Sequence, residues 1–120
     1  MDNKVTISQL KLLFEETGRV RKWIGTPRDL AISVSIESAE LLEHFQWGPV
    51  VKNKEDLALE IADVCFYLFE LSRVLDIDIS DAINKKIVKI NQKYPVDKIL
   101  KYGEDFYNQQ KKKYRENKLN

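Results

Sequence analysis

Two pairs of acidic residues lie inside strongly apolar, helical stretches of this 120-residue chain. Glu37 and Glu40 form one pair, and Glu60 and Asp63 form the other. Residues three positions apart lie on the same face of an α-helix, so each pair directs two carboxylates the same way. If the two helices pack antiparallel, the four carboxylates meet. Burying four anions together costs many kcal/mol unless a cation lies between them.

The chemistry of the four side chains predicts which cation this would be. An all-oxygen site suits Mg²⁺, with Mn²⁺ as a substitute, far better than it suits zinc. The alternative is that the acids are solvated charges on amphipathic helices, and a single E-x-x-E would fit that alternative. The second pair favours a metal site.

Charge and cysteine content limit the classes of protein. The 20 basic and 19 acidic residues give a net charge of +1, which argues against a duplex-binding surface and against a nucleic-acid partner. A lone Cys65 permits no intramolecular disulfide. No apolar run approaches the roughly 18 residues that span a membrane, and the N-terminus lacks a signal-peptide core. We therefore expect a cytoplasmic protein that does not bind membranes.

Apolar spacing and capping residues predict helices along the whole chain. We expect the first helix to begin at Thr6 or Ser8 and to reach about Trp23. Further helices are expected from Thr26 and Pro27 to about Phe45, from Asn53 to about Leu75, from a Ser80 cap to Tyr94, and, shorter, over about 97–115. A strand over 30–36 is rejected, because no second strand could pair with it. The prediction is an all-α protein, a four-helix bundle with a short C-terminal helix, in a single domain of residues 1–120.

The tail over about 108–120 carries a net charge of +4, which leaves about −3 on the rest of the chain. We expect this tail to be a solvated helix end. The alternative is that it contacts substrate phosphates bound to a neighbouring subunit.

Three motifs resemble a known family when they are read in order. They are the run from Glu37 to Trp47 (E-S-A-E-L-L-E-H-F-Q-W), the run from Glu60 to Leu68 (E-I-A-D-V-C-F-Y-L), and the K-Y-P at 93–95. Together they resemble the MazG-like superfamily of all-α nucleoside triphosphate pyrophosphohydrolases, nearest its short dCTP pyrophosphatase-like branch. The resemblance covers about residues 5 to 108.

The resemblance implies Mg²⁺-dependent hydrolysis of a nucleoside triphosphate at its α–β phosphate linkage, giving the monophosphate and pyrophosphate. It implies that Glu37, Glu40, Glu60 and Asp63 bind the metal. A carboxylate that the metal does not fully engage can orient or deprotonate the attacking water, and we assign Glu40 to this catalytic role. Relatives build active sites between tightly packed subunits and the third helix is apolar over more than half its circumference, so we expect a homodimer or tetramer.

Four further positions match substrate-binding residues of the family, and Asn91 lies beside a fifth. Trp47 and Trp23 match tryptophans that stack on the base, although either could instead pack in a core or contact a second subunit. Lys86 and Tyr94 match residues near the triphosphate, although Lys86 could be an ordinary solvated lysine. The family asparagine after Lys86 falls on Ile90, so the adjacent Asn91 replaces it or the contact is lost.

The departures concern the sugar and base end of the pocket. Between Trp23 and Pro27 the loop is two residues shorter than usual, and the histidine often found there is missing. The resemblance therefore does not fix which base the substrate carries, and a dUTP-preferring diphosphatase of the same all-α type is the alternative enzyme. A non-catalytic helical interaction module is the alternative from another class, and metal dependence distinguishes it. We expect Glu43 to be a surface or interface charge, and His44, the lone histidine, to be structural rather than catalytic.

Overall fold

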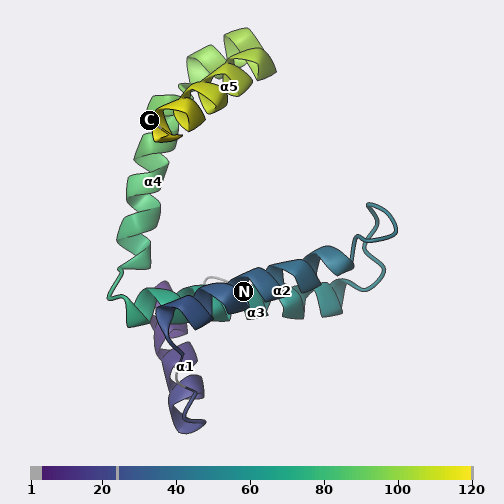
Figure 1. The fold of residues 1–120 in the computed structure, drawn as a ribbon, viewed down its shortest axis with the longest axis vertical. Coiled ribbons are helices and arrows are strands. Elements are labelled where there is room, and N and C mark those ends of the chain that lie inside the picture. The colour runs from purple at the N-terminus through teal and green to yellow at the C-terminus, as the bar shows by residue number, and fades with distance from the viewer. Residues whose placement is uncertain (1–3, 24, 120) are drawn as a thin grey trace. The chain divides into compact units, whose positions relative to one another are not determined.

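The computed structural model describes residues 4–23 and 25–119, and in this part of the chain it contains five helices and no strand (Figure 1). They are α1 (Ile7–Val20), α2 (Pro27–Glu43), α3 (Lys54–Val74), α4 (Ile79–Lys93) and α5 (Val96–Leu119). The all-α prediction is confirmed.

Three of these helices begin at the caps that the sequence predicts. The hydroxyl of Thr6 accepts the N–H of Gln9 at 3.2 Å, and the side chain of Gln9 accepts the N–H of Thr6 at 2.7 Å, which completes a capping box. Thr26 accepts the N–H of Asp29 at 3.1 Å. Asn53 caps α3 in the same way, with two bonds of 3.1 Å. Each cap stabilises its helix by about 1 kcal/mol.

Two predicted helix boundaries are wrong. The first helix ends at Val20 and not at Trp23, because the backbone turns at Lys22, whose φ of +55° lies outside the helical region. The fourth helix begins at Ile79, so Ser80 lies in its first turn and does not precede it. Asp78 directly precedes this helix, and aspartate is as favourable as serine before a first turn.

The C-terminal helix is longer than predicted and is interrupted. Gly103 has φ 67° and ψ −146°, which separates α5 into two helical segments. A residue without a Cβ adopts this conformation without strain. The segment after Gly103 packs on the end of α4 through Tyr107, whose ring stacks on Tyr94 with centroids 4.8 Å apart.

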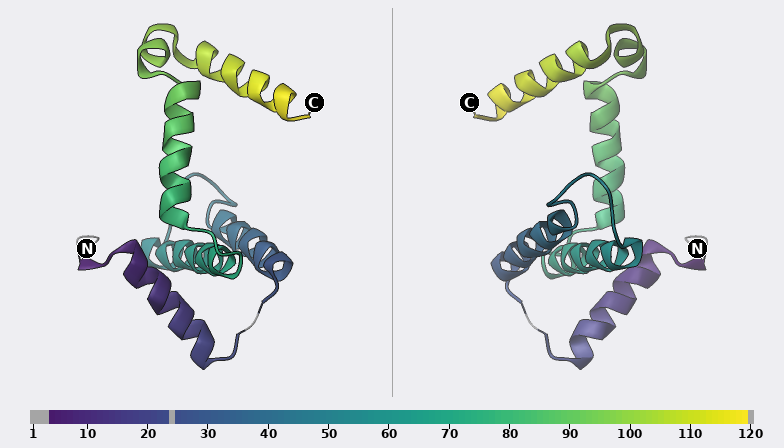
Figure 2. Two further views of the ribbon diagram at one scale, coloured as in Figure 1. Left: turned by 90° about the vertical axis from the view of Figure 1, so that its left-hand side faces the viewer. Right: turned by 90° about the vertical axis from the view of Figure 1, so that its right-hand side faces the viewer.

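The chain divides into two compact units, residues 1–79 and 80–120, which we describe separately. In the first, α2 and α3 lie side by side in opposite directions, and α1 contacts α3 (Figure 2). The rings of Phe14, Phe66 and Phe69 meet between α1 and α3, with centroid distances of 5.4 Å from Phe14 to each of the others. In the second, α5 contacts the C-terminal end of α4, where Nε2 of Gln110 donates to the carbonyl oxygen of Lys93 at 3.1 Å. The four-helix bundle and the single domain remain predictions.

Much apolar surface stays open on the helices of the first unit. Leu30 is the buried apolar side chain among the described residues, whereas Ile36 on α2 is 53% exposed and Leu59 on α3 is 66% exposed. Leucine and isoleucine are usually inside a folded protein. The α2 and α3 pair therefore presents apolar faces that the described residues of the first unit leave open.

Candidate metal centre and its surroundings

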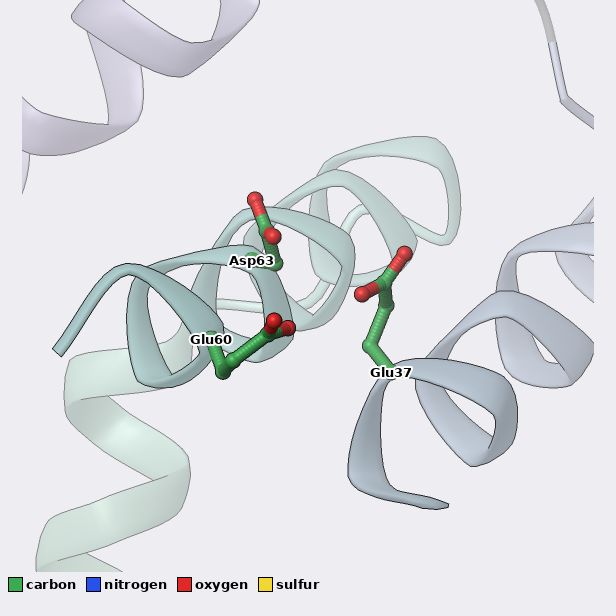
Figure 3. A group of neighbouring side chains, drawn as sticks. All are labelled: Glu37, Glu60 and Asp63. Carbon is green, nitrogen blue, oxygen red and sulfur yellow. The ribbon is translucent and has the colours of Figure 1, made fainter. Parts of the chain in front are cut away.

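Three carboxylates from α2 and α3 gather where the two helices pack. Glu37 of α2 and Glu60 and Asp63 of α3 each offer an oxygen, and these oxygens all lie within 4.8 Å of one another (Figure 3). The antiparallel packing brings Glu37 opposite two acids that lie one turn apart on α3. The meeting of acids from two helices, which the sequence predicts, is thus present for three of the four.

The cluster is partly removed from water. The Oε2 atoms of both Glu37 and Glu60 are buried and have no hydrogen-bond partner among the described residues. Burial raises the pKa of Glu37 above its ordinary value of 4.5, and the hydrogen bond with Glu40 and the charges of Glu40, Asp63 and Glu60 raise it further. Buried anionic oxygens without donors fit a site for a hard cation.

The fourth predicted acid lies at the edge of this cluster. Glu40 is close enough to Glu37 to form a hydrogen bond with it, but it is outside the group of three whose oxygens all meet within 4.8 Å. A carboxylate in this position is less engaged by the shared site than the other three. Its assignment as a fourth ligand and as the catalytic residue remains a prediction.

The two tryptophans that the resemblance assigns to the base lie at opposite ends of α2. Trp23 precedes the helix and Trp47 follows it, and a helix of 17 residues is about 25 Å long. Trp47 is 85% exposed, so it does not pack in a core of its own chain. Trp23 is 58% exposed and makes an edge contact with Phe66, with centroids 6.2 Å apart. One base cannot stack on both tryptophans of a single chain.

The residues predicted to contact the triphosphate belong to the second unit. Lys86 and Tyr94 line a cavity of about 470 Å³, together with Lys89, Lys93 and Tyr114. Ile90 lines this cavity and Asn91 is not among its lining residues. The replacement of the family asparagine by Asn91 therefore remains a prediction.

Comparison with known proteins places these features in a family. The sequence model of the MazG-like family matches residues 32–114. This range includes the acidic cluster, all of α4 and most of α5. The chain belongs to the MazG-like family.

Relatives of this MazG-like chain include enzymes with named activities. It is 31% identical over 102 residues to dCTP pyrophosphatase 1 of Mus musculus and 28% identical to that of Bos taurus, in each case over 76% of this chain and 60% of the relative. The chain thus spans about 60% of the length of these curated relatives. A crystal structure of a pyrophosphatase from Archaeoglobus fulgidus superposes with a TM-score of 0.68 and 37% identity, over 74% of this chain and 92% of that one.

None of the helices in the described part of this MazG-like chain is both long enough and apolar enough to cross a membrane.

His44 is a neighbour of the acidic cluster that the sequence analysis did not place there. Its Nε2 lies 3.8 Å from Oε1 of Glu60. The spacing indicated this position, because His44 follows Glu37 by seven residues, or about two helical turns. At the C-terminal end of α2 it therefore lies on the same helix face as Glu37.

A second missed feature is an ion pair further along α3. Arg73 donates from Nη2 to Oε2 of Glu70 at 2.9 Å and from Nε to Oε1 at 3.3 Å. This hydrogen bonding raises the pKa of Arg73. Glu70 follows Asp63 by seven residues, so it occupies the same face of α3 two turns away. Nothing in the sequence alone shows that this carboxylate is buried.

Proposed function

We propose that this MazG-like protein is a Mg²⁺-dependent nucleoside triphosphate pyrophosphohydrolase. It cleaves the α–β phosphate linkage of a deoxynucleoside triphosphate, dCTP or a non-standard analogue, to the monophosphate and pyrophosphate. The observation that carries the proposal is a pair of buried carboxylate oxygens, on Glu37 and Glu60, that lie beside Asp63 and find no hydrogen-bond partner in the described part of the chain. The names of the relatives support the reaction, and dCTP pyrophosphatase 1 supports the substrate.

Glu37, Glu60 and Asp63 would hold the ion, with Glu40 as a fourth ligand. Bound Mg²⁺ would neutralise the triphosphate and polarise the reacting phosphorus. Glu40, which is outside the group of three, would orient a water molecule and accept its proton while the water oxygen attacks phosphorus. The bond between the attacked phosphorus and the bridging oxygen breaks. If water attacks the α phosphorus, pyrophosphate leaves with the bridging oxygen. If water attacks the β phosphorus, the monophosphate leaves with it.

The active site is shared between two copies of the chain. The separation of Trp23 and Trp47 along α2 supports this, because both can contact one nucleotide only if they come from different copies. The open apolar faces of α2 and α3 support it independently, since a second copy would bury them and complete a four-helix bundle. Lys86 and Tyr94 would contact the triphosphate, and Asn91 would contact the sugar and base end of the nucleotide.

Product analysis tests the reaction directly. Purified protein with Mg²⁺ is incubated with dCTP, dUTP, dATP, dGTP and dTTP, and the quenched mixtures are separated. We expect monophosphate and pyrophosphate in equal amounts, no diphosphate, and no turnover after chelation of the metal. Release of inorganic phosphate with diphosphate would contradict cleavage at the α–β linkage. Absence of turnover on a wider panel of triphosphates would favour a non-catalytic helical module.

A further inference from the structure

The Glu70 and Arg73 pair of α3 is buried on one side. The side chain of Glu70 is 8% exposed, and that of Arg73 is 42% exposed. A second pair with the same spacing, Glu16 and Arg19 on α1, lies fully at the surface with a distance of 2.7 Å. Burying an ion pair is often no more stabilising than placing apolar residues there. The burial of Glu70 therefore calls for a reason other than stability.

The two side chains line a cavity of about 390 Å³ in the first unit, with Trp23, Ser33 and Tyr67 among its other walls. Polar side chains and three aromatic rings, those of Trp23, Phe66 and Tyr67, therefore line the same cavity, as is common in sites for small molecules. Tyr67 belongs to α3 and Ser33 to α2, so the cavity lies along the same helix pair as the acidic cluster.

Close packing fixes Glu70 beside the segment that carries Trp23. The N–H of Trp23 donates to the carbonyl oxygen of Gly18 at 3.0 Å. Gly18 is buried against Glu70, and a Cβ on this glycine would lie 3.8 Å from Oε2 of Glu70. The backbone that places the indole of Trp23 therefore runs next to the carboxylate of Glu70.

The distance from the acidic cluster suits a nucleoside. Asp63 and Glu70 lie on one face of α3, seven residues or about 10 Å apart along the helix axis, and Tyr67 lies between them. On α2, Ser33 lies one turn before Glu37. Because α2 and α3 are antiparallel, Ser33 is displaced from the acidic cluster toward the same end of the helix pair as Glu70. A nucleotide with its phosphates at the acidic cluster can place its base in this cavity.

We propose that Glu70 and Arg73 read the base of the substrate and select cytosine; this assignment rests on the proposed function. The two bonds to Arg73 leave two further acceptor positions on the carboxylate and three further N–H groups on the guanidinium. Glu70 accepts a hydrogen bond from the amino group at C4 of cytosine. Arg73 donates to the ring nitrogen or the carbonyl oxygen beside it. Uracil and thymine would place a carbonyl oxygen against the carboxylate, and the two would repel.

The test compares kcat/KM for dCTP and dUTP, which differ at this one group of the base. Wild-type protein should prefer dCTP. In Glu70→Gln, the Gln oxygen can still accept from Arg73 while its amide N–H₂ faces the base, which suits uracil. The dCTP to dUTP ratio should fall by about 10- to 100-fold, mainly through KM, with kcat on dUTP retained. Adenine presents its amino group and the adjacent ring nitrogen in the same order as cytosine, on a larger ring, so dATP is included in the assay. If the wild-type protein prefers dATP over dUTP and Glu70→Gln loses that preference, this result also supports the proposal.

The matched control is Glu16→Gln, which removes the same charge from a Glu and Arg pair of the same spacing at the surface. It should leave the ratio unchanged. An unchanged ratio in Glu70→Gln, or an equal loss on both substrates, overturns the role of Glu70. If wild-type protein hydrolyses the triphosphates and Glu70→Gln keeps the wild-type preference between dCTP and dUTP, only the role of Glu70 is refuted. If wild-type protein hydrolyses none of them, the proposed function is refuted as well.

A second measurement avoids any folding defect of the variant. The triphosphate of 2′-deoxyzebularine has a pyrimidinone ring with hydrogen in place of the amino group. Wild-type protein should use it at least about 10-fold less efficiently than dCTP, because Glu70 loses its donor. Equal kcat/KM values for the two would overturn the proposal.

Discussion

Glu37 of α2 and Glu60 of α3 each bury a carboxylate oxygen that has no hydrogen-bond partner among the described residues, and both residues contribute an oxygen to one group within 4.8 Å. Two helices that are far from fully packed elsewhere thus bring like charges together at one place. Without a cation this arrangement opposes folding.

Added Mg²⁺ should raise the melting temperature of the wild-type protein. A ligand that binds the folded state alone stabilises it by mass action, by about 2.7 kcal/mol at a concentration 100 times its dissociation constant. Glu40→Gln, Glu60→Gln and Asp63→Asn should lose most of this shift and nearly all hydrolysis, while the metal-free variants are as stable as the wild type or more so. Thermal melts with Mg²⁺ and with a chelator measure both effects.

The control for this experiment is Glu55→Gln, which neutralises an exposed acid five residues before Glu60, away from the face that carries the cluster. Its Mg²⁺ response and its activity should match those of the wild type. If Mg²⁺ leaves wild-type stability unchanged and the neutralised variants keep near-normal activity, the acids are solvated surface charges.

The stability of the metal-free protein should fall as pH rises above about 4.5. Burial raises the pKa of Glu37 in the folded state, with Glu40, Asp63 and Glu60 as charged neighbours, so the folded state holds a proton that the unfolded chain has lost. The loss extends from the ordinary pKa up to the raised one. Denaturant unfolding across this range, in the presence of a chelator, measures it.

Glu37→Gln should flatten this dependence, because the variant has no carboxylate to titrate at that position. His44, beside Glu60, is present in both proteins. Parallel pH profiles for the variant and the wild type would show that Glu37 is not the source.

Trp47→Ala should raise KM for the substrate more than it lowers kcat. Stacking on a base is worth about 1–3 kcal/mol, and the exposed indole has no core to stabilise within its chain. Val50→Ala is the control, since Val50 lines the same cavity of about 460 Å³ and is 74% exposed but offers no ring. An unchanged KM with a lower melting temperature for Trp47→Ala would instead indicate a packing or subunit contact.

The protein should sediment as a homodimer or a tetramer at micromolar concentration. The exposed apolar side chains of α2 and α3 are the reason, and Ile36→Arg should shift the population toward the monomer. The melting temperature of the wild type should also rise with protein concentration. A wild-type monomer at this concentration would contradict the shared active site.

Local chemistry explains which parts of the fold could be predicted from the sequence. Thr6, Thr26 and Asn53 cap the helices that follow them, because a side-chain oxygen satisfies nearby N–H groups whatever the rest of the chain does. The boundaries at Lys22 and Ile79 were missed, since more than one residue could end or begin the helix there. Gly103 can leave the helical region without strain, but a single glycine does not by itself require an interruption of α5.

Helical periodicity fixes which residues share a face, so the sequence alone is enough to place the acids in pairs on the faces of two apolar helices. Which of these acids meet depends on packing: α2 packs on α3 so that Glu37 approaches Glu60 and Asp63, while Glu40 stays at the edge. Packing also buries Glu70 beside Trp23 and leaves the two tryptophans at opposite ends of α2. Spacing along a chain specifies a direction on one helix, whereas burial and proximity between helices depend on how those helices pack.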